Sequence, residues 1–160
     1  MDALLAIRLA SEARDGDIAD AMTVMTAAFP PEYGEAWSAG QLASMMRLPG
    51  AALAVARLGE KPVGFALMRT IAGESELLLL AVHPDHRGAG HGSRLLDRCM
   101  SEAERNGART MFLEVRADNP AIRLYSRAGF LQYNIRRNYY SGKSGQRYDA
   151  LSFKIIMAQD

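Results

Sequence analysis

A turn rich in glycine is the stretch of this chain best suited to binding an anion. Arg87, Gly88, Gly90 and Gly92 follow a continuous apolar run over residues 77–82. The residues after the turn have apolar side chains at helical spacing, so a helix is expected to begin there. Glycine lets the backbone approach a ligand closely, and the N–H groups and dipole of a helix N-terminus attract negative charge. The pattern predicts a strand, a phosphate-binding turn and a helix.

The residues of this turn do not fit two familiar nucleotide-binding motifs. A P-loop requires a lysine after its last glycine, and none follows here. A dinucleotide-binding turn requires a third glycine where Ser93 stands. The spacing that remains is Arg-x-x-Gly-x-Gly, formed by Arg87, Gly90 and Gly92. If the turn is considered without the rest of the chain, the alternative interpretation is an ordinary strand-to-helix loop.

The segments that precede the turn predict how it is positioned. A strand at residues 5–10 leads to two helices, the first capped by Asp17 and the second by the pair Ser38 and Gln41. Three apolar strands joined by short turns then form an antiparallel meander. These strands cover residues 51–58, 63–71 and 77–82.

The segments after the turn complete an α/β (α+β) pattern. The expected elements are a helix ending at Asn106-Gly107, a strand at 110–115, a helix from Asn119-Pro120 to Gly129, and strands at 130–135 and 148–156. A polar loop is expected at 138–146. The order β-α-α-β-β-β-α-β-α-β-β predicts a mixed, mainly antiparallel sheet of about seven strands flanked by helices.

Composition narrows the class of protein. A length of 160 residues favours a single domain over residues 1–160, and 49% hydrophobic with 23% charged residues is typical of a globular protein that is not a membrane protein. A formal net charge of +1 gives no strong field toward nucleic acid or membrane. The first ten residues are too short for a signal peptide or a membrane span. These features favour a cytoplasmic location.

The cysteine and histidine residues do not suggest a metal site. The lone cysteine, Cys99, lies on the apolar stripe of its helix and is expected to pack in the core. His83, His86 and His91 have no zinc-ligand spacing and no supporting cysteine. We therefore expect no metal, with these histidines lining a ligand channel or facing solvent.

Beyond the glycine turn, three segments carry a resemblance to a known family. They are Leu113–Asn119 (LEVRADN), Leu124–Phe130 (LYSRAGF) and Ile135–Tyr140 (IRRNYY), with Asp149-Ala150 further on. Together with the Arg-x-x-Gly-x-Gly turn and the order of elements, they resemble the GNAT acetyltransferases. The LEVR and RRNYY segments are similar to the bacterial ribosomal-protein-alanine N-acetyltransferases, a branch of that superfamily. The resemblance implies the GNAT fold and acetyl-CoA as cosubstrate.

The resemblance also implies two catalytic residues. In the family, the position of Glu114 holds the general base and the position of Tyr125 holds the general acid. The chemistry is understandable, because an α-amine with a pKa of about 7.7–8.0 is largely protonated at neutral pH and cannot attack a thioester until a base removes its proton. The departing thiolate then benefits from a proton donor. The alternative interpretation makes Glu114 a surface charge and Tyr125 a packing residue.

Cofactor contacts implied by the family are mostly made by the backbone. Residues 80–82 are expected to meet the thioester and pantetheine arm, and the glycine turn is expected to hold the pyrophosphate. The implied residues are Leu80, Ala81, Val82, Arg87, Gly88, Ala89, Gly90, His91, Gly92, Ser93 and Asn119. The chain has one residue fewer between Asn119 and Tyr125 than the family usually has. Either the helix starts later or Asp118 takes part of the role of Asn119.

Two segments are expected to contact the acceptor. One is the loop at residues 31–37, which combines Tyr33, Glu35 and Trp37 with glycine and proline and is longer than the usual family loop. The other is the run that contains Arg136 and Tyr139, which lies near the acceptor peptide in the family. The alternative interpretation of the loop is a hydrophobic plug between two helices. RNA binding by the arginine–tyrosine run is the other alternative, but it is disfavoured because no wider basic patch surrounds the two arginines.

The resulting hypothesis is an acetyl-CoA-dependent transferase that acetylates a protein N-terminal α-amine, the N-terminal alanine of a small-subunit ribosomal protein. The alternatives are an enzyme for a small amine or for another protein N-terminus, and a non-catalytic acetyl-CoA-binding module. We expect no direct nucleic-acid or membrane partner. We also expect a monomer or weak homodimer.

Overall fold

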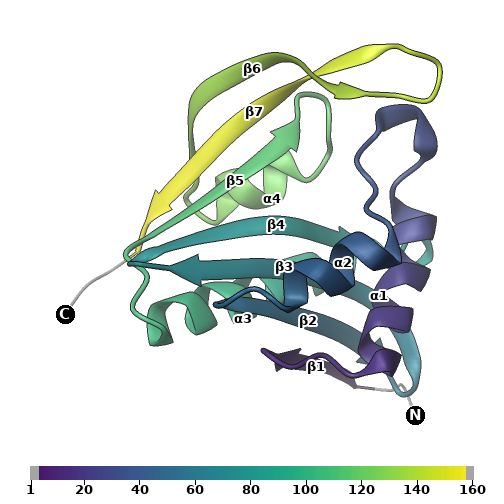
Figure 1. Ribbon diagram of the computed structural model, residues 1–160, viewed down its shortest axis with the longest axis vertical. Coiled ribbons are helices and arrows are strands. Elements are labelled where there is room, and N and C mark those ends of the chain that lie inside the picture. The colour runs from purple at the N-terminus through teal and green to yellow at the C-terminus, as the bar shows by residue number, and fades with distance from the viewer. Residues whose placement is uncertain (1–3, 158–160) are drawn as a thin grey trace.

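The computed structural model describes residues 4–157, which form one seven-stranded sheet with helices on both faces (Figure 1). The strands are β1 (Leu5–Ala10), β2 (Ala51–Leu58), β3 (Lys61–Ile71), β4 (Glu74–Val82), β5 (Thr110–Arg116), β6 (Leu131–Ser141) and β7 (Arg147–Ile156). The α-helices are α1 (Asp15–Ala28), α2 (Ala39–Met46), α3 (His91–Arg105) and α4 (Ile122–Arg127). The sheet order is β1-β2-β3-β4-β5-β7-β6, and only β4 and β5 are parallel neighbours. The predicted mixed, mainly antiparallel α/β sheet is confirmed; residues 1–3 and 158–160 of the predicted domain lie outside the described part.

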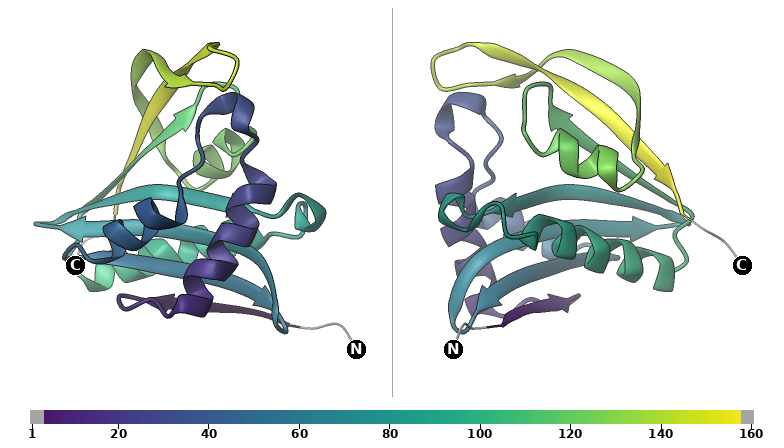
Figure 2. Two further views of the ribbon diagram at one scale, coloured as in Figure 1. Left: turned by 45° about the vertical axis from the view of Figure 1, so that its right-hand side comes forward. Right: turned by 180° about the vertical axis from the view of Figure 1, so that it is seen from behind.

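Helices cover both faces of the first four strands. Helices α1 and α2 lie on one face, and α3 and α4 lie on the other (Figure 2). Leu53 and Val55 of β2 belong to the core cluster beneath α1 and α2, whereas Ala52 and Ala54 belong to the cluster beneath α3. Because successive residues are buried on opposite faces, the sequences of these strands are continuously apolar and do not alternate between apolar and polar residues.

Helix α3 anchors the glycine turn to the sheet. Its buried side chains include Leu95, Leu96, Cys99 and Ala103, the stripe predicted from the sequence. Burial raises the pKa of the Cys99 thiol to about 12, so this residue stays protonated and serves as core packing. No helix among residues 4–157 is long and apolar enough to cross a membrane.

The sheet splits between β4 and β5. These strands pair only from Glu74 with Thr110 to Leu77 with Leu113, although β4 continues for five more residues to Val82. At the same point, Leu67 pairs with Leu79 and Met68 with Leu77. One residue of β4 is therefore extra, and such a bulge bends the strand that contains it. Figure 1 shows β5 diverging from β4 beyond this point, while β5 keeps its pairing with β7 along its whole length.

Strand β6 is longer than predicted. The sequence suggested a strand at 130–135 and a polar loop at 138–146, but β6 runs to Ser141. The pairing with β7 is irregular near Asn138, which has a φ of 54° and donates its N–H to Asp149 Oδ1 at 2.9 Å. Asparagine tolerates this left-handed conformation, so the strand continues through a bulge that the polar composition had concealed.

The start of α1 also differs from its prediction. The helix begins at Asp15, and Asp17 is a buried residue of the first turn rather than the cap. Its carboxylate accepts hydrogen bonds from the Arg14 backbone at 3.0 Å, from Arg8 at 2.8 Å and from Arg57 at 3.0 Å. By contrast, the predicted pair Ser38 and Gln41 does cap α2. Asp17 therefore joins α1 to β1 and β2.

We predict that Asp17→Asn lowers the free energy of unfolding at pH 7 by about 1.5–3 kcal/mol, the usual contribution of a hydrogen bond to a charged group. Burial would raise the pKa of Asp17, but the Arg14 hydrogen bond and the charges of Arg57 and Arg8 outweigh it and hold the pKa below its usual value. The stabilisation is present above the pKa of the unfolded chain and is lost as the pH falls through the lower folded value.

Urea unfolding of both proteins between about pH 7 and pH 2 checks this prediction. The difference between them should shrink below about pH 4. Asp15→Asn, at an exposed position of the same turn, is the matched control and should change little at any pH. A difference that stays constant down to pH 2 would contradict the assigned ion pairs.

Candidate active site

The opening between β4 and β5 contains two adjoining cavities. The first, called here the carboxylate pocket, is lined by Trp37, Glu76, Glu114, Tyr125, Tyr139 and Tyr140 together with residues 77–80. The second, called the glycine groove, follows the end of β4 into the glycine turn at residues 86–93. Phe29, Glu35, Leu80 and Asn119 line both cavities, so the two meet at these side chains.

The glycine groove has the strand–turn–helix geometry predicted from the sequence. Gly88 and Gly90 have φ angles of 82° and 83°, which only glycine adopts readily, and α3 begins at the next residue, His91. Of the residues expected to contact a cofactor, all but Ala89 line the groove. They are Leu80, Ala81, Val82, Arg87, Gly88, Gly90, His91, Gly92, Ser93 and Asn119.

Histidines form part of the groove wall. Burial lowers the pKa of His91, with further contributions from His86 and Arg94, so its imidazole is neutral at neutral pH. His86 Nε2 and His91 Nδ1 are buried without a hydrogen-bond partner in the described part of the chain. Within residues 4–157, no group of three histidine, cysteine or acidic residues is arranged to hold a metal ion.

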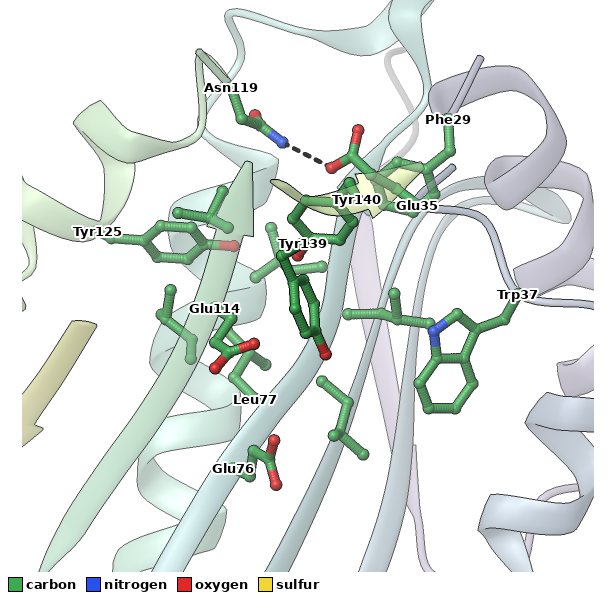
Figure 3. A pocket seen from close by; sticks show the side chains of 15 residues that line it. Phe29, Glu35, Trp37, Glu76, Leu77, Glu114, Asn119, Tyr125, Tyr139 and Tyr140 are labelled. Atoms are coloured by element: carbon green, nitrogen blue, oxygen red, sulfur yellow. Dashed lines mark hydrogen bonds between the residues drawn. The ribbon is translucent and has the colours of Figure 1, made fainter. Parts of the chain in front are cut away.

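Glu114 and Tyr125 enter the carboxylate pocket from different elements. Glu114 stands on β5 just beyond the point where pairing with β4 ends, and its Oε1 lies 2.8 Å from Nε of Arg136. Tyr125 comes from α4 and directs its hydroxyl into the pocket (Figure 3). Burial raises the pKa of Tyr125, as do the nearby Cys99, Tyr140 and Glu35. The phenol therefore keeps its proton at neutral pH, as a proton donor must.

Arg116 joins the loop at residues 31–37 to the end of β5. This arginine is only 7% exposed, donates from Nε to Glu35 Oε1 at 3.0 Å and also contacts Asp118. Its guanidinium carbon lies 3.6 Å from the centre of the Tyr33 ring, a cation–π contact. Asn119 Nδ2 donates to the other oxygen of Glu35 at 3.3 Å (Figure 3). A buried arginine thus fixes both Tyr33 and Glu35.

Comparison with known proteins identifies the family. Residues 19–130 match the acetyltransferase (GNAT) family. The chain belongs to the GNAT family. Its fold is that of the ribosomal-protein-S18-alanine N-acetyltransferase crystal structure from Escherichia coli, with a TM-score of 0.83 and 31% identity over 98% of this chain and 96% of that chain.

Two curated GNAT relatives bear the same description, ribosomal protein bS18-alanine N-acetyltransferase. The Escherichia coli protein is 43% identical over 99 residues, which are 61% of this chain and 64% of that protein. The Haemophilus influenzae protein is 38% identical over 96 residues, which are 60% of this chain and 63% of that protein. The aligned region therefore covers less than two thirds of the length of each relative.

The start of α4 resolves the short spacing between Asn119 and Tyr125. The sequence predicted a helix from Asn119-Pro120, but α4 begins at Ile122. Asn119 Oδ1 accepts a hydrogen bond from the N–H of Ala121 at 2.8 Å, so the asparagine shapes the turn before the helix. The later helix start, one of the two alternatives, is therefore what the structure shows.

The residues expected to contact an acceptor divide into two groups. Trp37 and Tyr139 line the carboxylate pocket, and Arg136 reaches Glu114 beside it. Arg116 lies over the ring of Tyr33, and the Glu35 carboxylate accepts hydrogen bonds from Arg116 and Asn119. The first group faces the carboxylate pocket, and the second group lines the glycine groove while also holding the loop in place.

Three residues of the site were missed by the sequence analysis. Arg116 was given no role, because its partner Glu35 is 81 positions away in the sequence. Tyr140 lines the pocket beside Tyr139, and the Tyr-Tyr pair was a signal for it. Glu76 lines the same pocket from β4, but it precedes the apolar run at 77–82 and lay outside the predicted strand.

The loop and the β6–β7 hairpin touch through glycine backbones. A Cβ added to Gly142 would lie 1.7 Å from the carbonyl oxygen of Glu32, and one added to Gly34 would lie 2.0 Å from that of Ser141. The N–H of Lys143 donates to the carbonyl of Pro31 at 3.3 Å in the same contact. These segments cover the carboxylate pocket and can approach so closely only because neither glycine has a side chain.

We predict that Gly142→Ala separates the loop from the hairpin and lowers the free energy of unfolding by about 1–3 kcal/mol, as overpacking commonly does. Hydrogen exchange at the Lys143 amide should accelerate relative to wild type. The control is Ser144→Ala at an exposed position in the same turn, which should preserve both properties. Unchanged exchange and stability in Gly142→Ala would contradict the contact.

Proposed function

We propose that this chain transfers the acetyl group of acetyl-CoA to the N-terminal α-amine of a protein, namely the N-terminal alanine of ribosomal protein bS18. One observation carries the proposal: Glu114 and Tyr125 face a common pocket that meets the glycine groove at Leu80 and Asn119. A base and an acid thus stand where an acceptor from one cavity would meet a donor from the other. The names of the GNAT relatives support the choice of acceptor.

Acetyl-CoA fits the glycine groove by the chemistry of its walls. The turn from Arg87 to Ser93 offers backbone N–H groups at the N-terminus of α3, which suit a pyrophosphate. Residues 78–82 have β3 on one side and no strand on the other, so backbone groups of Leu80 to Val82 are available to the pantetheine arm. One N–H there would polarise the thioester carbonyl.

The reaction follows from the placement of the two side chains. Glu114 takes a proton from the α-ammonium, and the free amine attacks the thioester carbonyl carbon. The nitrogen of the tetrahedral intermediate loses a second proton to solvent, and the intermediate collapses as the carbon–sulfur bond breaks. Glu114 also releases its proton, which finally reaches solvent. Tyr125 then gives its proton to the departing CoA thiolate and recovers one from solvent. The net products are an amide, CoA and one proton.

The acceptor is proposed to lie between the loop and the β6–β7 hairpin. An N-terminal amine is adjacent to its own backbone amides, whereas a lysine amine stands on a long flexible stem. We propose that Trp37, Tyr139 and Arg136 contact the first residues of an extended peptide, while Tyr33 and Glu35 hold the loop that carries Trp37. The enzyme would act as a cytoplasmic monomer or weak homodimer of one domain, without nucleic acid or membrane.

A peptide panel read by mass spectrometry tests this function. The panel contains short peptides that begin with Ala, the same peptides with blocked α-amines, peptides with internal lysines, and free small amines. We predict acetylation of the α-amine of Ala-terminal peptides and none on lysine or blocked termini. If lysine peptides or small amines were better substrates than every Ala-terminal peptide, the proposed acceptor would be wrong.

We predict that Glu114→Gln lowers kcat/KM by about 10²–10⁴ near neutral pH, the range for loss of a general base. The amide keeps the shape of the side chain but cannot accept the proton. CoA affinity should change little, because Glu114 does not line the glycine groove. Part of the activity should return at high pH, where the amine loses its proton to solvent. Wild-type rates at pH 7 would eliminate Glu114 as the base.

A further inference from the structure

A second carboxylate, Glu76, shares the pocket with Glu114. Glu76 pairs with Phe112 across the parallel strands, so the two side chains lie on the same face of the sheet. Glu114 follows Phe112 by two residues on β5 and therefore also lies on this face. Both carboxylates line the carboxylate pocket (Figure 3), and Glu76 is the more exposed of the two.

Glu76 has no evident structural use. Among residues 4–157 it takes part in no side-chain hydrogen bond or ion pair, whereas Glu114 is held by Arg136. Partial burial raises the pKa of Glu76, and so does the negative charge of Glu114, while Arg136 and Arg69 oppose the rise. The fold therefore keeps an acidic group where its ionised form is disfavoured, which is more typical of a functional position than of a stabilising one.

We propose that Glu76 is the second proton carrier of the acceptor site, which takes the amine proton from Glu114 and releases it to solvent. The inference rests on the proposed N-acetyltransferase function. The amine gives its proton to the Glu114 carboxylate, which becomes a carboxylic acid. That acid passes the proton, directly or through one water, to the Glu76 carboxylate. Glu76 then loses it to bulk water, and both residues return to their ionised forms.

The geometry explains why Glu114 needs such a neighbour. Its side chain is only 24% exposed, and Arg136 occupies one of its oxygens, so direct exchange with bulk water is hindered. Glu76 lines the same pocket and is itself exposed, so it can exchange protons with bulk water. Partial burial and the negative charge of Glu114 both raise the pKa of Glu76, so it binds a proton more readily than an ordinary surface glutamate does.

Buffer rescue separates proton transfer from charge attraction. The acceptor is whichever amine the wild-type enzyme acetylates best, so the comparison works even if that amine is not a protein N-terminus. We expect Glu76→Gln to lower kcat about 10-fold, less than the loss from removing a direct base, with little change in the acceptor KM or in CoA affinity. Imidazole added at constant pH and ionic strength should restore much of the rate, and Glu76→Asp should retain most of it.

The matched control is Glu74→Gln. Glu74 is an exposed carboxylate on the same strand and the same face, but it does not line the pocket. Its loss should leave kcat and the response to imidazole unchanged. Since the raised pKa of Glu76 means that its charge opposes folding above that pKa, Glu76→Gln should be as stable as wild type or more stable at pH 7.

Two outcomes would overturn the proposal. Wild-type kcat in Glu76→Gln would show that Glu76 carries no proton. A loss confined to KM, without rescue by imidazole, would show that Glu76 only attracts the cationic acceptor. Neither outcome touches the peptide panel or Glu114→Gln, which test the proposed function separately.

Discussion

The early end of pairing between β4 and β5 is the constraint on which the site depends. Buried backbone N–H and C=O groups need partners, and a strand normally finds them on both sides. After Leu77 and Leu113, β4 is paired on one side only, and the extra residue opposite Leu67 and Met68 marks the place where its course changes. The backbone groups left along residues 78–82 are the ones that a bound substrate can use. In the proposed function, acetyl-CoA contacts these free backbone groups in the place where a neighbouring strand would otherwise pair.

Keeping the sheet open requires support from segments that are remote in sequence. Strand β7 pairs with β5 along its full length and holds it away from β4. Arg116 at the end of β5 is tied to Glu35, and the loop containing Glu35 rests on the β6–β7 hairpin through the two glycine contacts. These contacts hold the segments around the pocket in one arrangement, as the positioning of reacting groups requires.

Local signals in the sequence predicted most of the fold, including the strand, turn and helix that form the glycine groove. The glycine turn, the capping pair Ser38 and Gln41, and the apolar runs of β2 to β4 depend on neighbouring residues, and all three were confirmed. The contacts that were missed join distant residues. Arg116 contacts Glu35, which is 81 positions away in the sequence. Glu76 lies close enough to Glu114 to be affected by its charge only because β4 and β5 pair in parallel. The bulge at Asn138 was missed because polar residues on an edge strand resemble a loop.

The central claim is that both substrates meet in the opening of the sheet, between Glu114 and Tyr125. A crystal structure with a conjugate of CoA to the α-amine of an Ala-terminal peptide tests it most directly. We predict that the pyrophosphate lies at the turn from Arg87 to Ser93 and the pantetheine arm along residues 80–82. The α-amine nitrogen of the conjugated peptide should lie within reach of both catalytic side chains. A conjugate whose peptide end lay outside the carboxylate pocket, with Glu114 still paired to Arg136 and remote from the amine, would contradict it.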